Sequence, residues 1–182
     1  LDGRTAMASG ESKWITGEAA RADVQKMRAK SSALLSTSAT VLADNPSLNV
    51  RWEDFPDDLK SVYAKQAVRQ PVRVLLDSQH RIRPSHKLFK TTSPGWLVSS
   101  VERDISAFPD FCEQIILPKQ NLLSELMFEL GKRQINCLWV EAGANLAGSL
   151  IEQELVDELI VYIAPKLLGE QARGLCRLPH LT

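Results

Sequence analysis

The stretch from Ile135 to Leu150 (INCLWVEAGANLAGSL) constrains the fold more than any other part of the chain. It opens with a largely apolar run, Ile135 to Val140, of the kind that is typical of a central strand buried on both faces. A glycine-bearing turn, Glu141 to Gly143, follows this run. After the turn the spacing is helical, with Leu146 and Leu150 on one face. The stretch therefore predicts a strand, a tight turn and a helix in succession.

A strand-turn-helix unit of this kind suggests a ligand site. In an open α/β sheet, ligands bind in the crevice beyond the carboxyl ends of the strands, and a helix that begins there directs N–H groups toward an anion. Gly143 would let the backbone approach a ligand, and Gly148 would let the helix pack closely on the sheet. Spacing alone does not distinguish this reading from an ordinary strand-to-helix connection.

The rest of the chain alternates between similar strands and helices. Apolar or β-branched runs predict buried strands, and residues that recur at helical spacing predict helices, which together favour a mostly parallel sheet with helices on both faces. Residues 52–70 are charged and contain prolines, so they predict a surface excursion with one helix. The predicted strands are Ala33–Leu35, Val72–Leu76, Trp96–Ser99, Gln114–Leu117 and Val156–Ala164, and the predicted helices are Gly17–Lys30, a turn near Val41 and Asn121–Leu130.

Composition limits the classes of partner. The 182 residues suit one domain, and 22 basic against 22 acidic residues give no net charge that would attract nucleic acid or a membrane surface. The three cysteines are far apart, which argues against a disulfide framework or a zinc site. The longest apolar run near the end of the chain, Leu159–Ala164, is too short to cross a bilayer. No signal peptide follows Leu1. We expect a cytoplasmic protein with a small-molecule partner.

Several common catalytic motifs are missing from the sequence. Gly143 and Gly148 have the glycine spacing of a P-loop, but no lysine follows them. The dinucleotide fingerprint G-x-G-x-x-G also fails, because Ala144 and Asn145 stand where its second glycine would be. The three histidines have no metal-ligand spacing, so no metal is expected. The chain contains no G-x-S-x-G nucleophile elbow.

What remains is a set of polar residues near predicted strand ends and loops. Each alone is more often a surface charge, a helix cap or a packing residue than a functional group. Together they suit a small polar ligand, in particular one that carries phosphate. The set is Ser12, Trp14, Arg28, Thr40, Asp44, Arg51, Ser78 and Glu141.

Five long blocks carry a resemblance to a known family. They read LDGRTAMASGESKWIT, TSATVLADNPSLNVR, LLDSQHRI, LWVEAGANLAGSL and VDELIVYIAPKLLG, and they span nearly the whole chain. The chain resembles the reductase domain of the bacterial bifunctional riboflavin-biosynthesis deaminase/reductase. The resemblance implies an α/β fold of the dihydrofolate-reductase type over residues 1–182. It also implies a homodimer that reduces 5-amino-6-(5-phosphoribosylamino)uracil to the ribitylamino compound with NADPH.

Site residues follow from the resemblance by motif. Glu141 and Asp44 are the implied candidates for proton delivery or water orientation. The implied substrate contacts are Ser12, Arg28, Leu48, Arg51 and Glu141. The implied NADPH contacts are Trp14, Thr40, Asp44, Ser78, Gly143, Ala144, Asn145, Leu146, Ala147, Gly148 and Ser149.

The chain departs from the family pattern in three ways. It lacks the His-x-Glu and Pro-Cys-x-x-Cys zinc signature of the deaminase half, so it can supply only the reductase step of a longer parent polypeptide. Ala144-Asn145 stands where a proline and a hydroxyl residue are expected in the glycine turn. The final residues, LCRLPHLT, carry neither a helix nor a strand, so we expect the C-terminal part of the fold to be incomplete.

Two other functions fit parts of the pattern. A pterin reductase of the dihydrofolate-reductase type would share the fold and cofactor, but it needs an early acid to hold the pterin ring. The loop from Ser9 to Trp14 and the arginines suit a phosphosugar better. A non-catalytic nucleotide-binding or dimerisation module is the second alternative, and nothing in the expected site looks broken.

Overall fold

The computed structural model describes residues 2–12 and 15–180 and divides into two compact units. One unit runs from Val24 to Glu141. The other combines the N-terminal residues up to Asp23 with the residues from Ala142 onward. The helix that leads from one into the other is α1 (Glu18–Lys30), as the spacing predicted.

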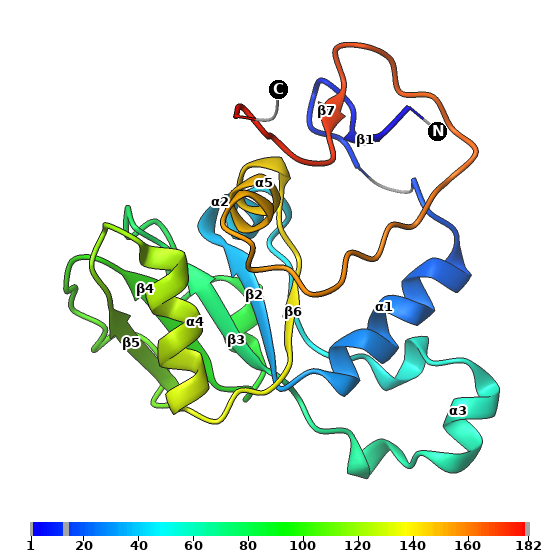
Figure 1. The fold of residues 1–182 in the computed structure, drawn as a ribbon. Helices are drawn as coiled ribbons and strands as arrows, with labels where there is room; N and C mark the ends of the chain where they lie inside the picture. Colours follow the sequence, from blue (N-terminus) through cyan, green and yellow to red (C-terminus); the bar gives the residue numbers. More distant parts are fainter. Residues whose placement is uncertain (1, 13–14, 181–182) are drawn as a thin grey trace. The chain divides into compact units, whose positions relative to one another are not determined.

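The Val24–Glu141 unit contains a five-stranded parallel sheet in the order β5-β4-β3-β2-β6 (Figure 1). All four pairings are parallel, which confirms the expected class of sheet. All carboxyl ends therefore lie at one edge of the sheet. The strands are β2 (Ala33–Thr37), β3 (Val72–Leu76), β4 (Gly95–Ser99), β5 (Cys112–Ile116) and β6 (Leu138–Val140).

The position of β6 differs from the sequence prediction. Of the run Ile135–Val140, only Leu138–Val140 forms a strand, and this strand lies at one end of the described sheet with half-buried residues. Asn136 and Cys137 are exposed. A strand at a sheet edge pairs on one side only, so it does not need an apolar residue at every position. The most completely buried strands lie further inside the sheet: β4 is buried at every residue, and β2, which pairs with both β3 and β6, is buried at all but its last residue.

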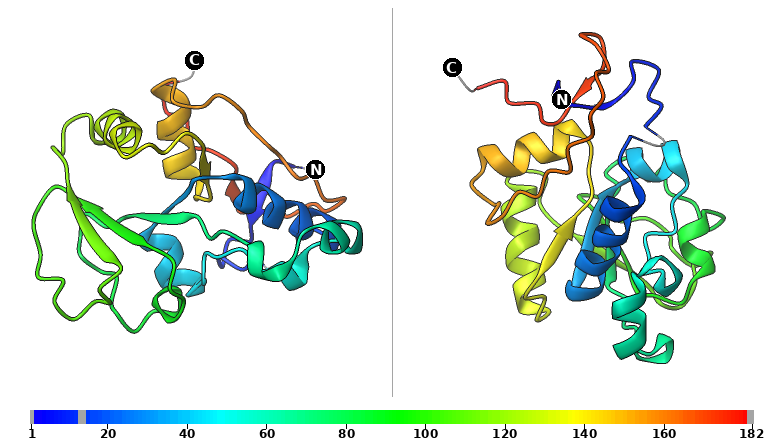
Figure 2. Two further views of the ribbon diagram at one scale, coloured as in Figure 1. Left: turned by 90° about the horizontal axis from the view of Figure 1, so that it is seen from below. Right: turned by 90° about the vertical axis from the view of Figure 1, so that its right-hand side faces the viewer.

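Helices cover both faces of this sheet. Figure 2 shows α2 (Ser38–Asp44) and α4 (Leu122–Lys132) on opposite sides. The helix predicted over Asn121–Leu130 is confirmed by α4, whose buried residues are Leu123, Leu126 and Leu130. Thr37 caps α2 by accepting a hydrogen bond from the Thr40 N–H. Both helices are thus defined by local sequence signals.

Residues 52–70, between α2 and β3, form a surface excursion, as expected. It contains one short helix, α3 (Asp57–Val62), between two turns of 3-10 helix, η1 (Trp52–Asp54) and η2 (Lys65–Ala67). A third such turn, η3 (Lys87–Lys90), precedes β4. The excursion is held by polar contacts at its surface, for example the ion pair between Lys65 and Glu53.

The core of this unit packs leucines and phenylalanines around β3 and β4. Phe89 and Phe108 meet edge to face at 5.2 Å, and Leu34, Leu75 and Leu97 lie beside them in one cluster. Two polar side chains also lie in this core in register across the strands. They are the fully buried Arg73 of β3 and Cys112 of β5, on either side of Gly95. The Arg73 guanidinium donates to the carbonyl oxygens of Leu88, Thr91 and Ser93, and burial lowers its pKa to about 10.

The second unit contains α5 (Ala144–Glu152) and a short antiparallel pair, β1 (Arg4–Ala6) with β7 (Arg173–Gly174). The predicted strand Val156–Ala164 is wrong, because no described residue of this segment belongs to a strand. Its apolar pattern is nevertheless strand-like, with Leu159, Val161 and Ile163 all exposed. A strand exists only as part of a hydrogen-bonded ladder, and no segment of the described chain pairs with these residues.

Two helical glycines test the packing, because substitution by alanine should change the unfolding free energy in opposite directions at the two positions. A Cβ on Gly148 of α5 would overlap the backbone carbonyl of Arg177, whereas a Cβ on Gly131 of α4 would meet nothing within 4 Å. We expect Gly148→Ala to lower the unfolding free energy by about 1–3 kcal/mol. Gly131→Ala should leave it unchanged or raise it by up to about 1 kcal/mol, because alanine favours a helix. Urea unfolding of both variants measures this, and equal effects would contradict the described packing of α5.

The cysteines should react at different rates. All three are free, but Cys112 is buried and Cys137 exposed, and burial raises the pKa of the Cys112 thiol from 9.0 to about 11. Iodoacetamide near neutral pH should label Cys137 and spare Cys112 until the chain unfolds, as peptide mass spectrometry would show. Between pH 9.0 and about 11 the unfolded thiol ionises while the folded one stays neutral, so stability should fall as pH rises. Equal labelling of the two residues in the folded chain would refute this assignment.

Candidate functional site

Arg28 and Glu141 form a two-pronged ion pair at the carboxyl edge of the sheet. Arg28 lies in the last turn of α1, and Glu141 directly follows β6. The Nε and Nη2 atoms of Arg28 each donate to one carboxylate oxygen at 2.6 Å. The Arg28 side chain is 9% exposed and that of Glu141 is 24% exposed, so water screens the pair only weakly. Two residues that the family resemblance assigns to the substrate are therefore in direct contact.

The backbone and side chain of Glu141 are also fixed by neighbouring strands. Its N–H donates to the Leu35 carbonyl and its own carbonyl accepts from the Ser36 hydroxyl, both at 2.9 Å. The indole Nε1 of Trp139 donates to the Glu141 carboxylate at 2.8 Å. The carboxylate thus stands in one orientation, set by β2, β6 and α1 together.

A third bond from Arg28 connects this pair to a loop. Its Nη1 donates to the Asn49 carbonyl at 2.8 Å, and one helical turn earlier the Gln25 side chain accepts from the Arg51 N–H at 2.9 Å. The predicted substrate residues Leu48 and Arg51 lie on either side of Asn49. The Leu48 side chain is buried in the core and its backbone has a φ of 47°, while the Arg51 side chain is exposed and pairs with Asp54.

The predicted cofactor residues Thr40, Asp44 and Ser78 lie near the carboxyl ends of β2 and β3. Thr40 shares a hydrogen bond with the Thr37 hydroxyl at 3.3 Å. Asp44 lies one turn further along α2 and is exposed, and no other described side chain or backbone group bonds to its carboxylate. Ser78 is exposed and follows the buried Asp77. This edge of the sheet thus presents hydroxyl groups and a solvent-facing acid.

The remaining predicted residues belong to the other unit. Ser12 is exposed and lines a cavity of about 480 Å³ that is otherwise mostly apolar and includes Arg4, Ile160 and Leu175. Trp14 lies outside the described residues. The expected turn from Gly143 to Ser149 forms the start and middle of α5.

Taken by itself, the first turn of α5 has the features of an anion-binding site. Gly143 is the N-cap residue, no side chain caps the N–H groups that follow, and the turn has no acidic residue. Its unpaired N–H groups carry partial positive charge. Gly148 serves close packing as expected, but the segment that contacts it is the backbone of Arg177, not a strand.

Three contributors to the site were not predicted from the sequence: Ser36, the Asn49 carbonyl and Trp139. Trp139 had a detectable signal, since it precedes Glu141 by two residues and side chains two apart lie on the same side of a strand. The other two follow from tertiary contacts alone. The described residues contain no group of three or more metal-binding side chains, and no helix among them is long and apolar enough to cross a membrane.

Comparison with known proteins places the chain in a family. The model of the RibD C-terminal domain matches residues 1–182. The riboflavin biosynthesis protein RibD of Haemophilus influenzae is 78% identical over the whole chain, which covers 49% of that protein, and that of Escherichia coli is 53% identical with 50% covered. The chain thus spans about half the length of these relatives. A Buchnera aphidicola protein named 5-amino-6-(5-phosphoribosylamino)uracil reductase is 45% identical over 93% of the chain, and 83% of that protein is covered.

Solved structures agree on the fold. Acinetobacter baumannii RibD superposes with a TM-score of 0.78 at 37% identity, over 97% of this chain and 46% of that one. The riboflavin biosynthesis reductase Rib7 of Saccharomyces cerevisiae gives a TM-score of 0.73 at 24% identity over the whole chain and 76% of Rib7. These likenesses confirm the expected α/β fold of the dihydrofolate-reductase type. Since the family model matches every residue, this chain belongs to the RibD C-terminal domain family.

Proposed function

We propose that this chain reduces 5-amino-6-(5-phosphoribosylamino)uracil to 5-amino-6-(5-phosphoribitylamino)uracil, with NADPH as the reductant and residues 1–182 acting as one reductase domain. The observation that carries the proposal is that Arg28 holds the Glu141 carboxylate in one orientation through two hydrogen bonds. The proposal is supported by the Buchnera aphidicola relative named 5-amino-6-(5-phosphoribosylamino)uracil reductase, of whose length this chain covers 83%. The longer relatives named RibD suggest a parent polypeptide with a second activity, for which the deaminase is our candidate.

The donors and acceptors around Glu141 suit a sugar phosphate. Oε1 of Glu141 already accepts from Arg28 and Trp139, whereas Oε2 accepts only from Arg28, so Oε2 keeps a lone pair for a ribose hydroxyl. Arg51 uses only its Nε for Asp54, so the remaining N–H groups of its exposed guanidinium can bind a phosphate. Arg28 is largely occupied by Glu141 and Asn49, and its main role is to hold the carboxylate in place.

The chain also offers groups that fit NADPH. Within the unit from Ala142 onward, the uncapped first turn of α5 suits a phosphate. Within the Val24–Glu141 unit, the hydroxyls of Thr37, Thr40 and Ser78 suit ribose and amide groups. When bound, NADPH supplies a hydride to the first sugar carbon of the opened substrate. The chain's own task is to hold that carbon in a near-attack position and to exclude water, which is where most of the rate acceleration should arise.

The reduction also needs a proton at the substrate nitrogen. Asp44 and Glu141 remain our two candidates for its delivery. Both Glu141 oxygens already accept hydrogen bonds from Arg28, which suits an acceptor that orients the sugar. Asp44 is solvent-facing and has no bonded partner among the described residues, which suits exchange of a proton with water.

The first test is substrate-dependent oxidation of NADPH, followed by absorbance. We expect turnover with 5-amino-6-(5-phosphoribosylamino)uracil and none with dihydrofolate. Turnover of dihydrofolate instead would identify a pterin reductase. Binding of NADPH without turnover of either compound would favour a non-catalytic module. Homodimerisation and a cytoplasmic location stay predictions, and sedimentation of the purified chain would test the first.

A second test concerns the role of Glu141. Glu141→Gln keeps the shape of the side chain but removes the charge that binds Arg28, so we expect kcat/KM for the substrate to fall by about a hundredfold while NADPH binding is unchanged. Glu129→Gln is a matched control, because it breaks the 2.9 Å ion pair between Glu129 and Arg133 at the end of α4, away from the carboxyl ends of the strands. An unchanged rate in Glu141→Gln would remove Glu141 from the mechanism.

A further inference from the structure

The arginines in this part of the chain differ in their partners, and two of them, Arg81 and Arg83, form no ion pair with a carboxylate of the described chain. Arg28 is paired with Glu141, Arg51 with Asp54, and Arg103 with the buried carboxylate of Asp77 at 3.1 Å. Arg81 forms no ion pair with any carboxylate of the described chain, although it lies in the same region. Its positive charge is therefore available to an external anion.

The position of Arg81 is set by the buried Asp77. One Asp77 oxygen accepts from the Arg81 N–H at 2.8 Å, and the other accepts from the Ile82 N–H at 2.9 Å. Asp77 is 1% exposed and follows β3 directly. The backbone of the segment that carries Arg81 is thus fixed to the end of β3, so the side chain starts from a defined point.

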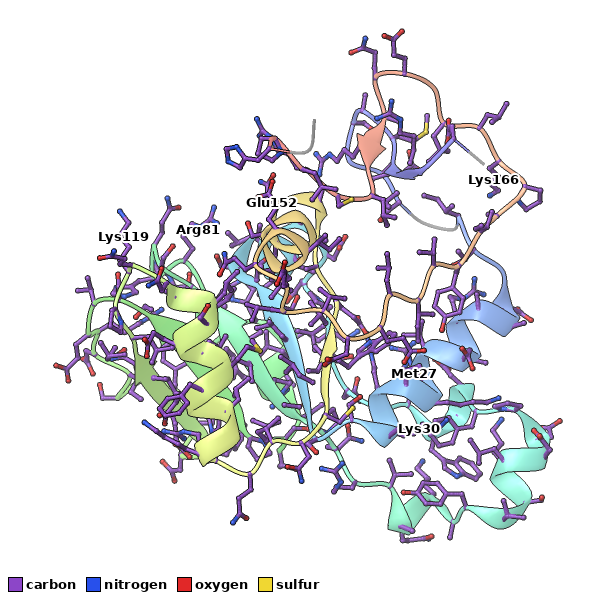
Figure 3. The ribbon with its side chains drawn as sticks, viewed as in Figure 1. Met27, Lys30, Arg81, Lys119, Glu152 and Lys166 are labelled. Carbon is purple, nitrogen blue, oxygen red and sulfur yellow. The ribbon has the colours of Figure 1, made fainter. Side chains whose placement is uncertain are left out.

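The guanidinium of Arg81 is directed toward the neighbouring strand. Its Nη2 donates to the hydroxyl of Ser38 at 3.2 Å, and Ser38 is the first residue after β2. Figure 3 shows the Arg81 side chain extending beyond the carboxyl ends of the strands. Most of its N–H donors have no partner in the described chain, and the exposed Ser78 follows the same strand, β3. A guanidinium beside a hydroxyl group, without a competing carboxylate, suits a phosphate.

The order of the strands indicates which phosphate this is. Glu141 and Arg28 mark the substrate end of the edge, at β6, and the nicotinamide must lie next to the substrate for hydride transfer. β3 lies on the other side of β2, about 10 Å from β6 at the usual strand spacing. A dinucleotide that starts at the substrate end therefore runs toward β3 with its adenosine half. Arg51, whose N–H bonds to Gln25 one helical turn before Arg28, is the candidate for the substrate phosphate.

We propose that Arg81 binds the 2′-phosphate of the adenosine ribose and thereby makes the chain prefer NADPH over NADH. This inference rests on the proposed function, because it requires a nicotinamide dinucleotide at the carboxyl edge. The two dinucleotides differ only in that phosphate, so a single cation that binds it is sufficient to separate their affinities.

Binding of each dinucleotide to the purified chain, measured by nicotinamide fluorescence, tests the proposal without turnover. We expect the wild type to bind NADPH more tightly than NADH. Arg81→Gln should weaken NADPH binding by about tenfold to a hundredfold and leave NADH binding unchanged. Arg81→Lys should retain part of the preference for NADPH over NADH, because lysine keeps the positive charge but cannot donate the two parallel hydrogen bonds of a guanidinium. The same loss should appear for 2′,5′-ADP as a competitor.

Arg83→Gln is the matched control. Arg83 is also exposed, lies two residues further on and donates only to the His80 carbonyl, so its loss should not change the ratio of the two affinities. Thermal unfolding of Arg81→Gln should match that of the wild type, since the guanidinium is exposed. Should the glutamine variant fail to fold, Arg81→Lys carries the test.

Three results would overturn the proposal. Equal weakening of NADPH and NADH in Arg81→Gln would assign Arg81 to a shared part of the dinucleotide, and no weakening of either would remove it from the site. Both leave the proposed function standing. A wild-type chain that binds neither dinucleotide would overturn this proposal and the proposed function together.

Discussion

The bond pair between Arg28 and Glu141 is the interaction on which the candidate site depends. It joins residues 113 positions apart, and through Asn49 it also fixes the loop between α2 and α3. An ion pair removed from water must regain in hydrogen bonds what it loses in solvation. Here both carboxylate oxygens and most guanidinium donors are matched, and Trp139 adds one more bond. These hydrogen bonds explain how a charged pair can lie among half-buried strands.

The parallel sheet determines where that pair lies. Because all five strands run the same way, the residues that follow them collect at one edge, whatever their order in the chain. The side chains at this edge fall into two groups. Near β6 they are a carboxylate and its arginine, and near β3 they are hydroxyls and Arg81. This division suits the proposed ligands: the acceptor near β6 fits the hydroxyls of a substrate, and the donors near β3 fit a dinucleotide cofactor.

Local sequence determined some elements and not others. β3 was predicted to the residue, because a β-branched run stands between Pro71 and Asp77. The helix α4 was as clear, since its leucines recur at helical spacing. The edge position of β6 was missed, as was the absence of a strand over Val156–Ala164, because both depend on which segments pair. At the site, Arg28 and Glu141 came from the family motifs, but their mutual contact could not, since nothing local links them. Arg81 was overlooked because a free charge is recognised only when all neighbouring carboxylates are placed.

The pairing of β6 with β2 has a consequence for how the molecule assembles. The Ser36 hydroxyl and the Glu141 carbonyl that it contacts are separated by 105 residues, so closing this contact loses more chain entropy than pairing β2 with β3. We expect β6 to join the sheet late, after β2 and β3 have formed a platform. Until then Arg28 does not have Glu141 as its partner, and the proposed substrate end of the edge is not formed. A ligand that contacts Glu141 would thus select the finished sheet from partly folded forms and stabilise it by mass action.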